Sequence, residues 1–99
     1  MSAQTNAREH TKNRIKKPSL YDVVMHNDDF TTMEFVVEIL ITIFNKGREE
    51  AAALMMAVHK NQKAVVGTYS YDIARTKAEE AERQARAEGF PFRLTVEEA

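Results

Sequence analysis

The segment from about Thr32 to Asn45 constrains the fold more than any other part of the chain. If this segment is a helix, its polar residues lie on one narrow stripe and nearly all its other residues are apolar. The polar residues are Glu34, Glu38, Thr42 and Asn45. A helix with this pattern is mostly buried. The remaining segments must therefore pack around it and cover its apolar faces.

The residues before this helix predict where it begins. Thr31 and Glu34 have the spacing of a capping box, and Phe30 and Phe35 fall at the two positions of a hydrophobic staple. Carboxylates are favoured near a helix N-terminus, so a well-formed helix entry is one explanation for the adjoining polar cluster. A cation-binding rim beside an apolar pocket is the other. The cluster consists of Asn27, Asp28 and Asp29.

Periodicity and turn residues predict five further elements. Alternation indicates a strand from Leu20 to His26, and β-branched residues indicate another from Lys63 to Ser70. Gly47 is expected to end the first helix, and a second helix is expected over Arg48 to Lys60. A third helix is expected from the cap Ser70 to about Glu88. The third carries a seam of small residues, Ala74, Ala78, Ala81 and Ala85. Alternation again predicts a last strand, in which Phe92, Leu94 and Val96 face one side.

The predicted order is β-α-α-β-α-β, an α/β (α+β) sandwich in one small domain. A chain of 99 residues can bury one core without further support. It has no cysteine, which excludes disulfides, thiolate catalysis and cysteine–zinc sites and fits a reducing compartment. No apolar run approaches the roughly 20 residues of a membrane span, and no signal-peptide core follows Met1, so no membrane partner is expected.

Residues 1–17 differ in charge from the rest of the chain. They carry five basic side chains and one acidic side chain, a net charge of +4, whereas residues 18–99 carry nine basic and fourteen acidic, a net charge of −5. Segments with so few large apolar residues do not order themselves, so a flexible basic extension is expected before a folded core of 18–99. The extension lacks aromatic residues for base stacking, and the acidic core would repel phosphates. Nucleic acid is therefore not an expected partner.

Few residues could support catalysis. His26, His59, Asp28, Asp29 and Glu34 are the available groups, and they match no recognised nucleophile or metal-ligand spacing. The three scattered glycines form no nucleotide-binding loop. We therefore expect a protein that is not an enzyme and has no cofactor or metal.

The same groups suit the capture of an ammonium. Carboxylates, an amide oxygen and a neutral imidazole nitrogen can accept its three N–H donors. Met55, Val58 and His59 share one face of the second helix, and Met33 and Val36 share one face of the first. Two purely structural explanations stay open. The methionine–valine stripe is typical of a core, and a histidine at a helix end can bind the last carbonyls of the helix. If these residues instead form a binding site, a free peptide N-terminus with a large apolar first residue would fit it.

At this point the sequence resembles the ClpS family, adaptors that deliver N-degron substrates to the bacterial ClpAP protease. The resemblance covers residues 18–99 and is carried by four blocks in order: PSLY, NDDFTTMEFVVEIL, MMAVHKNQKAVVGTYSYDIARTK and FPFRLTVEEA. It implies three antiparallel strands packed on three helices. It also implies a monomer of the bacterial cytoplasm that binds N-terminal peptides beginning with Leu, Phe, Tyr or Trp and docks on the N-domain of a ClpA-type AAA+ unfoldase.

The resemblance assigns roles to individual residues. Asn27 and His59 would bind the α-ammonium, with Asp28 supplying charge. Met33 would exclude β-branched first residues, and the basic extension would engage the unfoldase during hand-off. Asp72 and Lys77 match the docking positions. The pocket for the first side chain would be bordered or lined by Asp29, Thr31, Met33, Val36, Met55, Val58 and Phe92.

Four positions depart from the family pattern. Thr32 stands where proline is usual, Gln62 replaces a turn glycine, Arg75 stands where glutamate is common, and Phe92 replaces leucine at the pocket. These departures suggest a divergent or second copy of the adaptor. The alternative function is an unfoldase-docking regulatory module that does not read N-termini.

Overall fold

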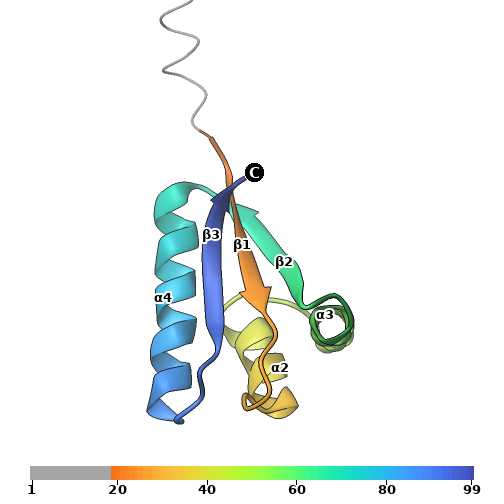
Figure 1. Cartoon of the computed structure of the whole chain (residues 1–99). Helices are drawn as coiled ribbons and strands as arrows, with labels where there is room; N and C mark the ends of the chain where they lie inside the picture. Colours follow the sequence, from red (N-terminus) through yellow and green to blue (C-terminus); the bar gives the residue numbers. More distant parts are fainter. Residues whose placement is uncertain (1–18) are drawn as a thin grey trace, which may run out of the picture.

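The structure is a computed structural model that describes residues 19–99. Its elements follow in the order β1, α2, α3, β2, α4 and β3 (Figure 1). Their bounds are Tyr21–His26, Met33–Thr42, Arg48–Asn61, Lys63–Tyr69, Tyr71–Ala87 and Arg93–Glu98. The predicted order β-α-α-β-α-β is confirmed. The predicted flexible extension, residues 1–17, lies outside the described residues.

The three strands form one antiparallel sheet with β1 in the middle, in the order β2-β1-β3. The pairing of β1 with β2 shifts between Val23 and Val24, because Val23 faces Gly67 whereas Val24 faces Val65. Val66 is the extra residue of this bulge, and its side chain is buried in the core. A Cβ at Gly67 would collide with the ring of Tyr69, which explains the glycine beside the bulge.

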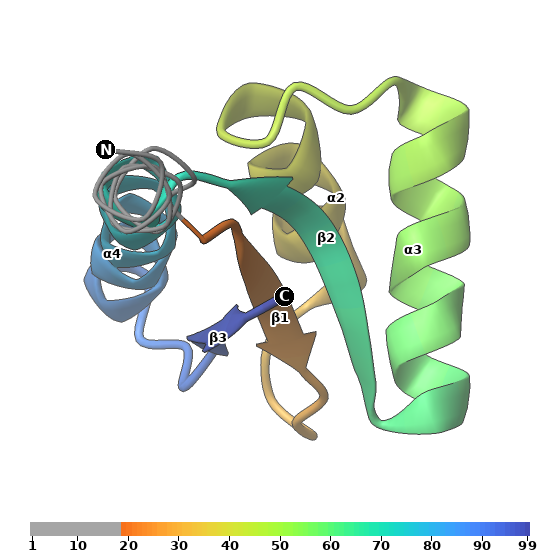
Figure 2. The ribbon, with the colours of Figure 1, turned by 90° about the horizontal axis from the view of Figure 1, so that it is seen from above.

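The helices cover one face of the sheet. Seen from above, α2 lies between α4 and α3 (Figure 2). Ile39 and Leu40 of α2 are almost completely buried, in the same core cluster as Val23 and Met25 of β1. The alanine seam of α4 is also buried, which lets this helix lie close to the sheet. The prediction that the first helix is mostly buried is therefore correct for one side only, because Val36, Ile39 and Leu40 are its buried residues.

The predicted start of α2 is wrong by one residue. The N-cap is Thr32, whose hydroxyl accepts from the Phe35 N–H at 3.2 Å. Thr31 instead belongs to the preceding turn, where its hydroxyl and its N–H both donate to Asp28. The predicted staple is also wrong, since the Phe30 side chain is 75% exposed.

The end of α2 also differs from the prediction. The helix ends at Thr42, and Asn45, with φ of 59°, provides the left-handed turn expected of Gly47. Asparagine tolerates this conformation better than most residues. Gly47 instead begins α3, where its carbonyl accepts from the Ala51 N–H at 2.8 Å. Among the described residues, no helix is long and apolar enough to cross a membrane.

Candidate functional site

The turn between β1 and α2 is organised by the carboxylate of Asp28. Its Oδ1 accepts from the N–H groups of Phe30 and Thr31 at 2.8 and 2.7 Å, and its Oδ2 accepts from the Thr31 hydroxyl at 2.8 Å. Aspartate side chains often stabilise turns by binding the backbone two or three residues ahead. The turn is therefore held from within, independently of any ligand.

A backbone hydrogen bond joins this turn to the end of α3. The Asn27 N–H donates to the carbonyl oxygen of Gln62 at 2.8 Å. Gln62 reaches this position in the left-handed conformation, with φ of 75°, and its own N–H donates to Val58 at the end of α3. This bond brings the last turn of α3, which carries His59, beside Asn27. No local pattern predicts this role of Gln62, although its match to a turn glycine is a signal of unusual backbone geometry.

The turn, α2 and α3 together enclose a cavity of about 250 Å³. Its polar side is formed by the turn and by His59, and its apolar side by methionine and valine side chains. Val36 and Val58 are almost fully buried, whereas the Met33 side chain is 57% exposed at the mouth. The lining residues are Asn27, Asp28, Asp29, Thr31, Met33, Val36, Met55, Val58 and His59.

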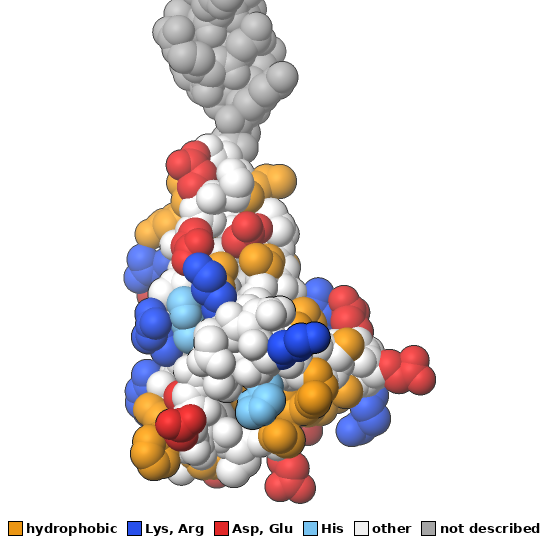
Figure 3. All heavy atoms as spheres, turned by 45° about the vertical axis from the view of Figure 1, so that its right-hand side comes forward, with side chains coloured by type: hydrophobic (Ala, Val, Ile, Leu, Met, Phe, Trp, Pro, Cys, Tyr) orange, Lys and Arg blue, Asp and Glu red, His pale blue; other side chains and the backbone are white. Residues whose placement is uncertain are grey.

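Nine of the ten residues predicted for the pocket and the ammonium site thus line one cavity. The tenth, Phe92, is 2% exposed and lines a smaller space of about 20 Å³ together with His26 and several of the same residues. Phe92 therefore lies beneath the main cavity and not on its wall. In Figure 3, hydrophobic side chains gather beside a histidine on the α3 side of the molecule, with acidic side chains at the edge of that face.

The charge of Asp28 is stabilised by the turn that it organises. Partial burial tends to raise the pKa of this carboxyl, but the hydrogen bonds from Thr31 and Phe30 and the positive charge of Arg86 outweigh it and lower the pKa. Asp28 is accordingly an anion at neutral pH. His26, beneath the cavity, has a lowered pKa because of burial and the nearby Arg93 and Lys63, partly offset by Glu97.

The two predicted docking residues lie in different environments on α4. Asp72 is exposed in its first turn. Lys77 is half-buried, and its Nζ donates to the carbonyl oxygen of Ile43 at 2.6 Å just after the end of α2. The same ammonium lies 5.9 and 5.5 Å from the ring centroids of Phe44 and Tyr69. The structure therefore gives Lys77 an internal role, and its role in docking stays a prediction.

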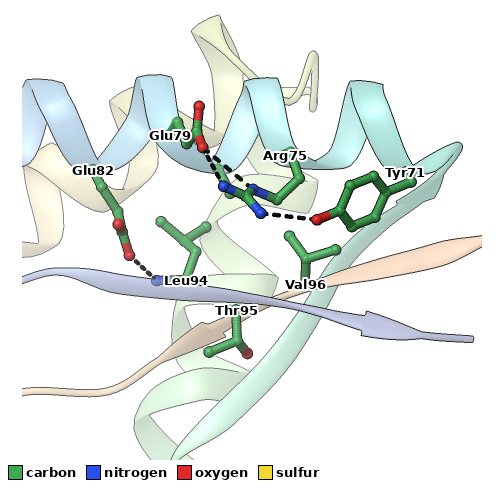
Figure 4. Close-up of a pocket in the computed structure, with 8 residues that line it drawn as sticks. Tyr71, Arg75, Glu79, Glu82, Leu94, Thr95 and Val96 are labelled. Carbon is green, nitrogen blue, oxygen red and sulfur yellow. Dashed lines mark hydrogen bonds and ion pairs between the residues drawn. The ribbon is translucent and has the colours of Figure 1, made fainter.

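A larger hollow of about 420 Å³ lies between α4 and β3 (Figure 4). Arg75 donates there to the Tyr71 hydroxyl at 2.8 Å and to Glu79 at 2.7 Å. The carboxylate of Glu82 accepts from the Leu94 N–H at 2.9 Å. Because these charged groups already bind other groups of the protein, this hollow is a weaker candidate for ligand binding than the cavity at the turn. The described residues contain no group of three or more side chains suited to holding a metal ion.

Comparison with known proteins places the chain in one family. Residues 16–95 match the family model of the ATP-dependent Clp protease adaptor protein ClpS. The ClpS adapter of Clostridium acetobutylicum is 47% identical over 100 residues, which cover 99% of each chain. That of Neisseria gonorrhoeae is 52% identical over 81 residues, which cover 82% of this chain and 78% of the relative.

A solved structure agrees in fold as well as in sequence. The structure of Agrobacterium tumefaciens ClpS2 bound to L-phenylalaninamide has a TM-score of 0.82 and 38% identity, and covers 84% of this chain and 100% of the other. These likenesses define a small α+β adaptor of an ATP-dependent protease. The chain belongs to the ClpS family, and the resemblance found from the sequence is confirmed.

Proposed function

We propose that this protein is a non-enzymatic adaptor of the bacterial cytoplasm that binds proteins through a free, bulky hydrophobic N-terminal residue. It delivers them to a ClpA-type AAA+ unfoldase for degradation. One observation carries the proposal: a single cavity combines acceptor groups on one side with methionine and valine walls on the other. An N-terminal residue such as Leu, Phe, Tyr or Trp presents the matching pair of features, a cation beside an apolar side chain.

The polar side of the cavity suits an α-ammonium. Asn27 and His59 accept its N–H groups, and the fixed anion of Asp28 favours its positive charge. The apolar side takes the first side chain, with Met33 and Met55 adapting to its shape. The ClpS2 structure supports this arrangement, because L-phenylalaninamide, its ligand, has a free amino group beside a phenyl side chain.

Binding of matched peptides tests the proposal. A fluorescent peptide beginning with Phe should bind, and acetylation of its N-terminus should weaken binding at least about tenfold, because each charge-assisted hydrogen bond contributes about 1.5–3 kcal/mol. Peptides beginning with Leu, Tyr and Trp should also bind, whereas Ile should bind poorly. His59→Ala should weaken binding of the Phe peptide, and Glu88→Ala, an exposed residue outside the cavity, should not.

Fluorescence anisotropy measures each dissociation constant. Equal binding of the free and the acetylated peptide would contradict recognition of the ammonium. That result, combined with retained binding to the unfoldase, would favour a docking module that does not read N-termini. Binding to the unfoldase N-domain is measured separately, with the Asp72→Asn variant as the probe of the proposed docking site.

A further inference from the structure

The connection between α4 and β3, residues 88–92, supplies the base of the candidate site. It ends in Phe92, which is 2% exposed and lines the small space beneath the main cavity together with Val36 and Val58. The last turn of α4 lies at the same end of the molecule as the turn between β1 and α2 (Figure 1). How firmly this connection is held therefore decides how fixed the base of the cavity is.

A single side chain, Arg86 in the last turn of α4, holds the backbone of this connection. Its Nη1 donates to the carbonyl oxygens of Phe90 and Phe92, at 2.8 Å in each case. Within the range 19–99, Arg86 forms no ion pair with a carboxylate. Its hydrogen-bonding capacity is therefore directed at the connection and not at a neighbouring side chain.

These contacts differ from those of an ordinary basic residue at a helix end. Such residues commonly bind the last carbonyls of their own helix and favour its dipole. Arg86 instead reaches four and six residues ahead, past the end of α4 at Ala87, to carbonyls that lie outside the helix. It therefore connects α4 to the residue beneath the cavity.

The rings of the same connection pack on α2. Phe35 lies edge-on to Phe90, with ring centroids 5.2 Å apart, and edge-on to Phe92, at 6.1 Å. The next residue of α2, Val36, lines both the main cavity and the space beneath it. Arg86 thus fixes the backbone of the connection while Phe35 receives its rings, so the Phe92 ring is held at one depth.

Arg86 also acts on the polar side of the site. Burial raises the pKa of Asp28, whereas the hydrogen bonds from Thr31 and Phe30 and the positive charge of Arg86 lower it. Electrostatic attraction weakens with distance, so this effect indicates that the guanidinium lies near the turn. The same side chain is therefore linked to the apolar base and to the anion of the cavity.

We propose that Arg86 is a positioning residue for substrate recognition, which fixes the depth of the cavity by holding the backbone on both sides of Pro91. This inference rests on the proposed function. With the Phe92 ring fixed, a compact first side chain such as Leu meets a wall that is already in place. When the connection is released, the ring can withdraw, and a longer side chain such as Trp gains room.

The test compares peptides that begin with Leu or Trp and are otherwise identical, in the wild type and in Arg86→Met. The variant should bind the Leu peptide about three- to tenfold more weakly, because a mobile Phe92 side chain must then be ordered on binding. The Trp peptide should lose less than about twofold, since its larger ring fills the space that Phe92 leaves. Both peptides carry the same α-ammonium, so a change at Asp28 alters both affinities equally and cancels in their ratio.

Two further variants separate positioning from a general effect on the fold. Arg86→Lys should restore part of the wild-type ratio, because both hydrogen bonds leave one nitrogen atom and an ammonium also has several donors. Arg83→Met removes the same groups one turn earlier on α4, where the side chain pairs with Glu80, and should leave the ratio unchanged. Circular dichroism should show every variant folded at the temperature of the titrations.

The carboxyl signal of Asp28, titrated by NMR without peptide, gives an independent readout. Its pKa should be higher in Arg86→Met than in the wild type and should stay low in Arg86→Lys, which keeps the positive charge. An unchanged Asp28 pKa in Arg86→Met would contradict the link between Arg86 and the turn.

An unchanged ratio of Leu to Trp affinity in Arg86→Met, or a ratio no closer to the wild type in Arg86→Lys, would overturn the positioning role alone. Failure of the wild type to bind either peptide would overturn the proposed function, and the positioning role with it.

Discussion

At the scale of single residues, Asp28 combines two roles that a substitution can separate. Its carboxylate holds the turn through three hydrogen bonds, and its charge faces the cavity. Asp28→Asn keeps one oxygen for the backbone N–H groups, but it removes the charge and the second oxygen, which accepts from the Thr31 hydroxyl. We expect it to weaken binding of a Phe-starting peptide moderately, and Asp28→Ala to weaken it further, by about 1.5–3 kcal/mol in total. Anisotropy titrations of both variants measure the difference.

The pH dependence of Asp28 follows from its lowered pKa. Its pKa in the folded state lies below the value of about 3.9 for an unperturbed aspartate. The stability that the turn gains is therefore complete above that pH and is lost as the pH falls through the folded-state pKa. Between about pH 5 and 7 the peptide's α-amino group is also protonated, so the part of binding that depends on the Asp28 charge should be constant there. A loss of Asp28-dependent binding within that range, seen by comparing wild type with Asp28→Asn, would contradict the assignment.

The neighbouring threonines show what sequence could and could not predict at this scale. Thr31 and Thr32 are adjacent and chemically identical, and Thr31 has capping-box spacing with Glu34. The choice between them depends on Asp28, which binds both the hydroxyl and the N–H of Thr31 and leaves Thr32 to cap the helix. Local spacing predicted the helix, but competition among side chains for the same groups decided its first residue.

At the scale of secondary-structure elements, two helix caps can be compared directly. Thr32 and Ser70 both occupy N-cap positions, but only Thr32 accepts a hydrogen bond from the helix through its side chain. Thr32→Ala should lower the free energy of unfolding by about 1 kcal/mol. Ser70→Ala should change it by less than about 0.5 kcal/mol, as for an ordinary surface substitution. Urea unfolding measures both values, and equal losses would show that the two caps do not differ in this way.

Lys77 connects α4 to the end of α2, so its substitution should affect stability. In Lys77→Met the apolar stem is kept, but the hydrogen bond to the Ile43 carbonyl and the contacts with two aromatic rings are lost. We expect the free energy of unfolding to fall by about 1–3 kcal/mol. Asp72→Asn, on the exposed first turn of the same helix, should cost only a few tenths of a kcal/mol.

This contrast matters for any test of unfoldase docking. If Lys77→Met unfolds at the same urea concentration as the wild type, its internal role is contradicted. If it is destabilised as expected, weaker docking of that variant would not by itself identify a contact with the partner. The Asp72→Asn variant then gives the clearer test of the proposed docking surface.

The elements themselves could be predicted because each has a strong local pattern. The alanine seam of α4, the apolar helix at 33–42 and the alternation around Leu94 specify the type of each element. The residue that follows α2 also makes a contact that is distant in sequence. Lys77, 34 residues along the chain from Ile43, binds the carbonyl that follows α2, and no local pattern reveals that bond.

At the scale of the whole molecule, the candidate site depends on how the sheet places two helices. The end of β1 is tied to the end of α3 through Asn27 and Gln62, and α2 begins immediately after the turn. Met33 and His59, 26 residues apart, therefore line the same cavity. Helical spacing could group Met55, Val58 and His59 on one face, but only the family resemblance indicated which residues faced them across the cavity.

The predicted division into a core and a basic extension leads to the last prediction. All residues that line the candidate cavity lie between Asn27 and His59. Removal of residues 1–17 should therefore leave the dissociation constant for a Phe-starting peptide unchanged. The same truncation should lower the rate at which the unfoldase and its protease degrade a Phe-starting substrate, toward the rate without adaptor, because the extension is proposed to engage the unfoldase.

A variant with residues 2–17 in scrambled order is the control for this experiment, since it keeps the length and the charge of the extension. If the scrambled chain delivers substrate as well as the wild type, hand-off depends on an extension of that length and charge and not on a specific motif. If the truncated chain supports the same degradation rate as the full chain, the extension has no part in delivery. Weaker peptide binding by the truncated chain would instead show that the extension contributes to substrate recognition, contrary to the division proposed between the two parts.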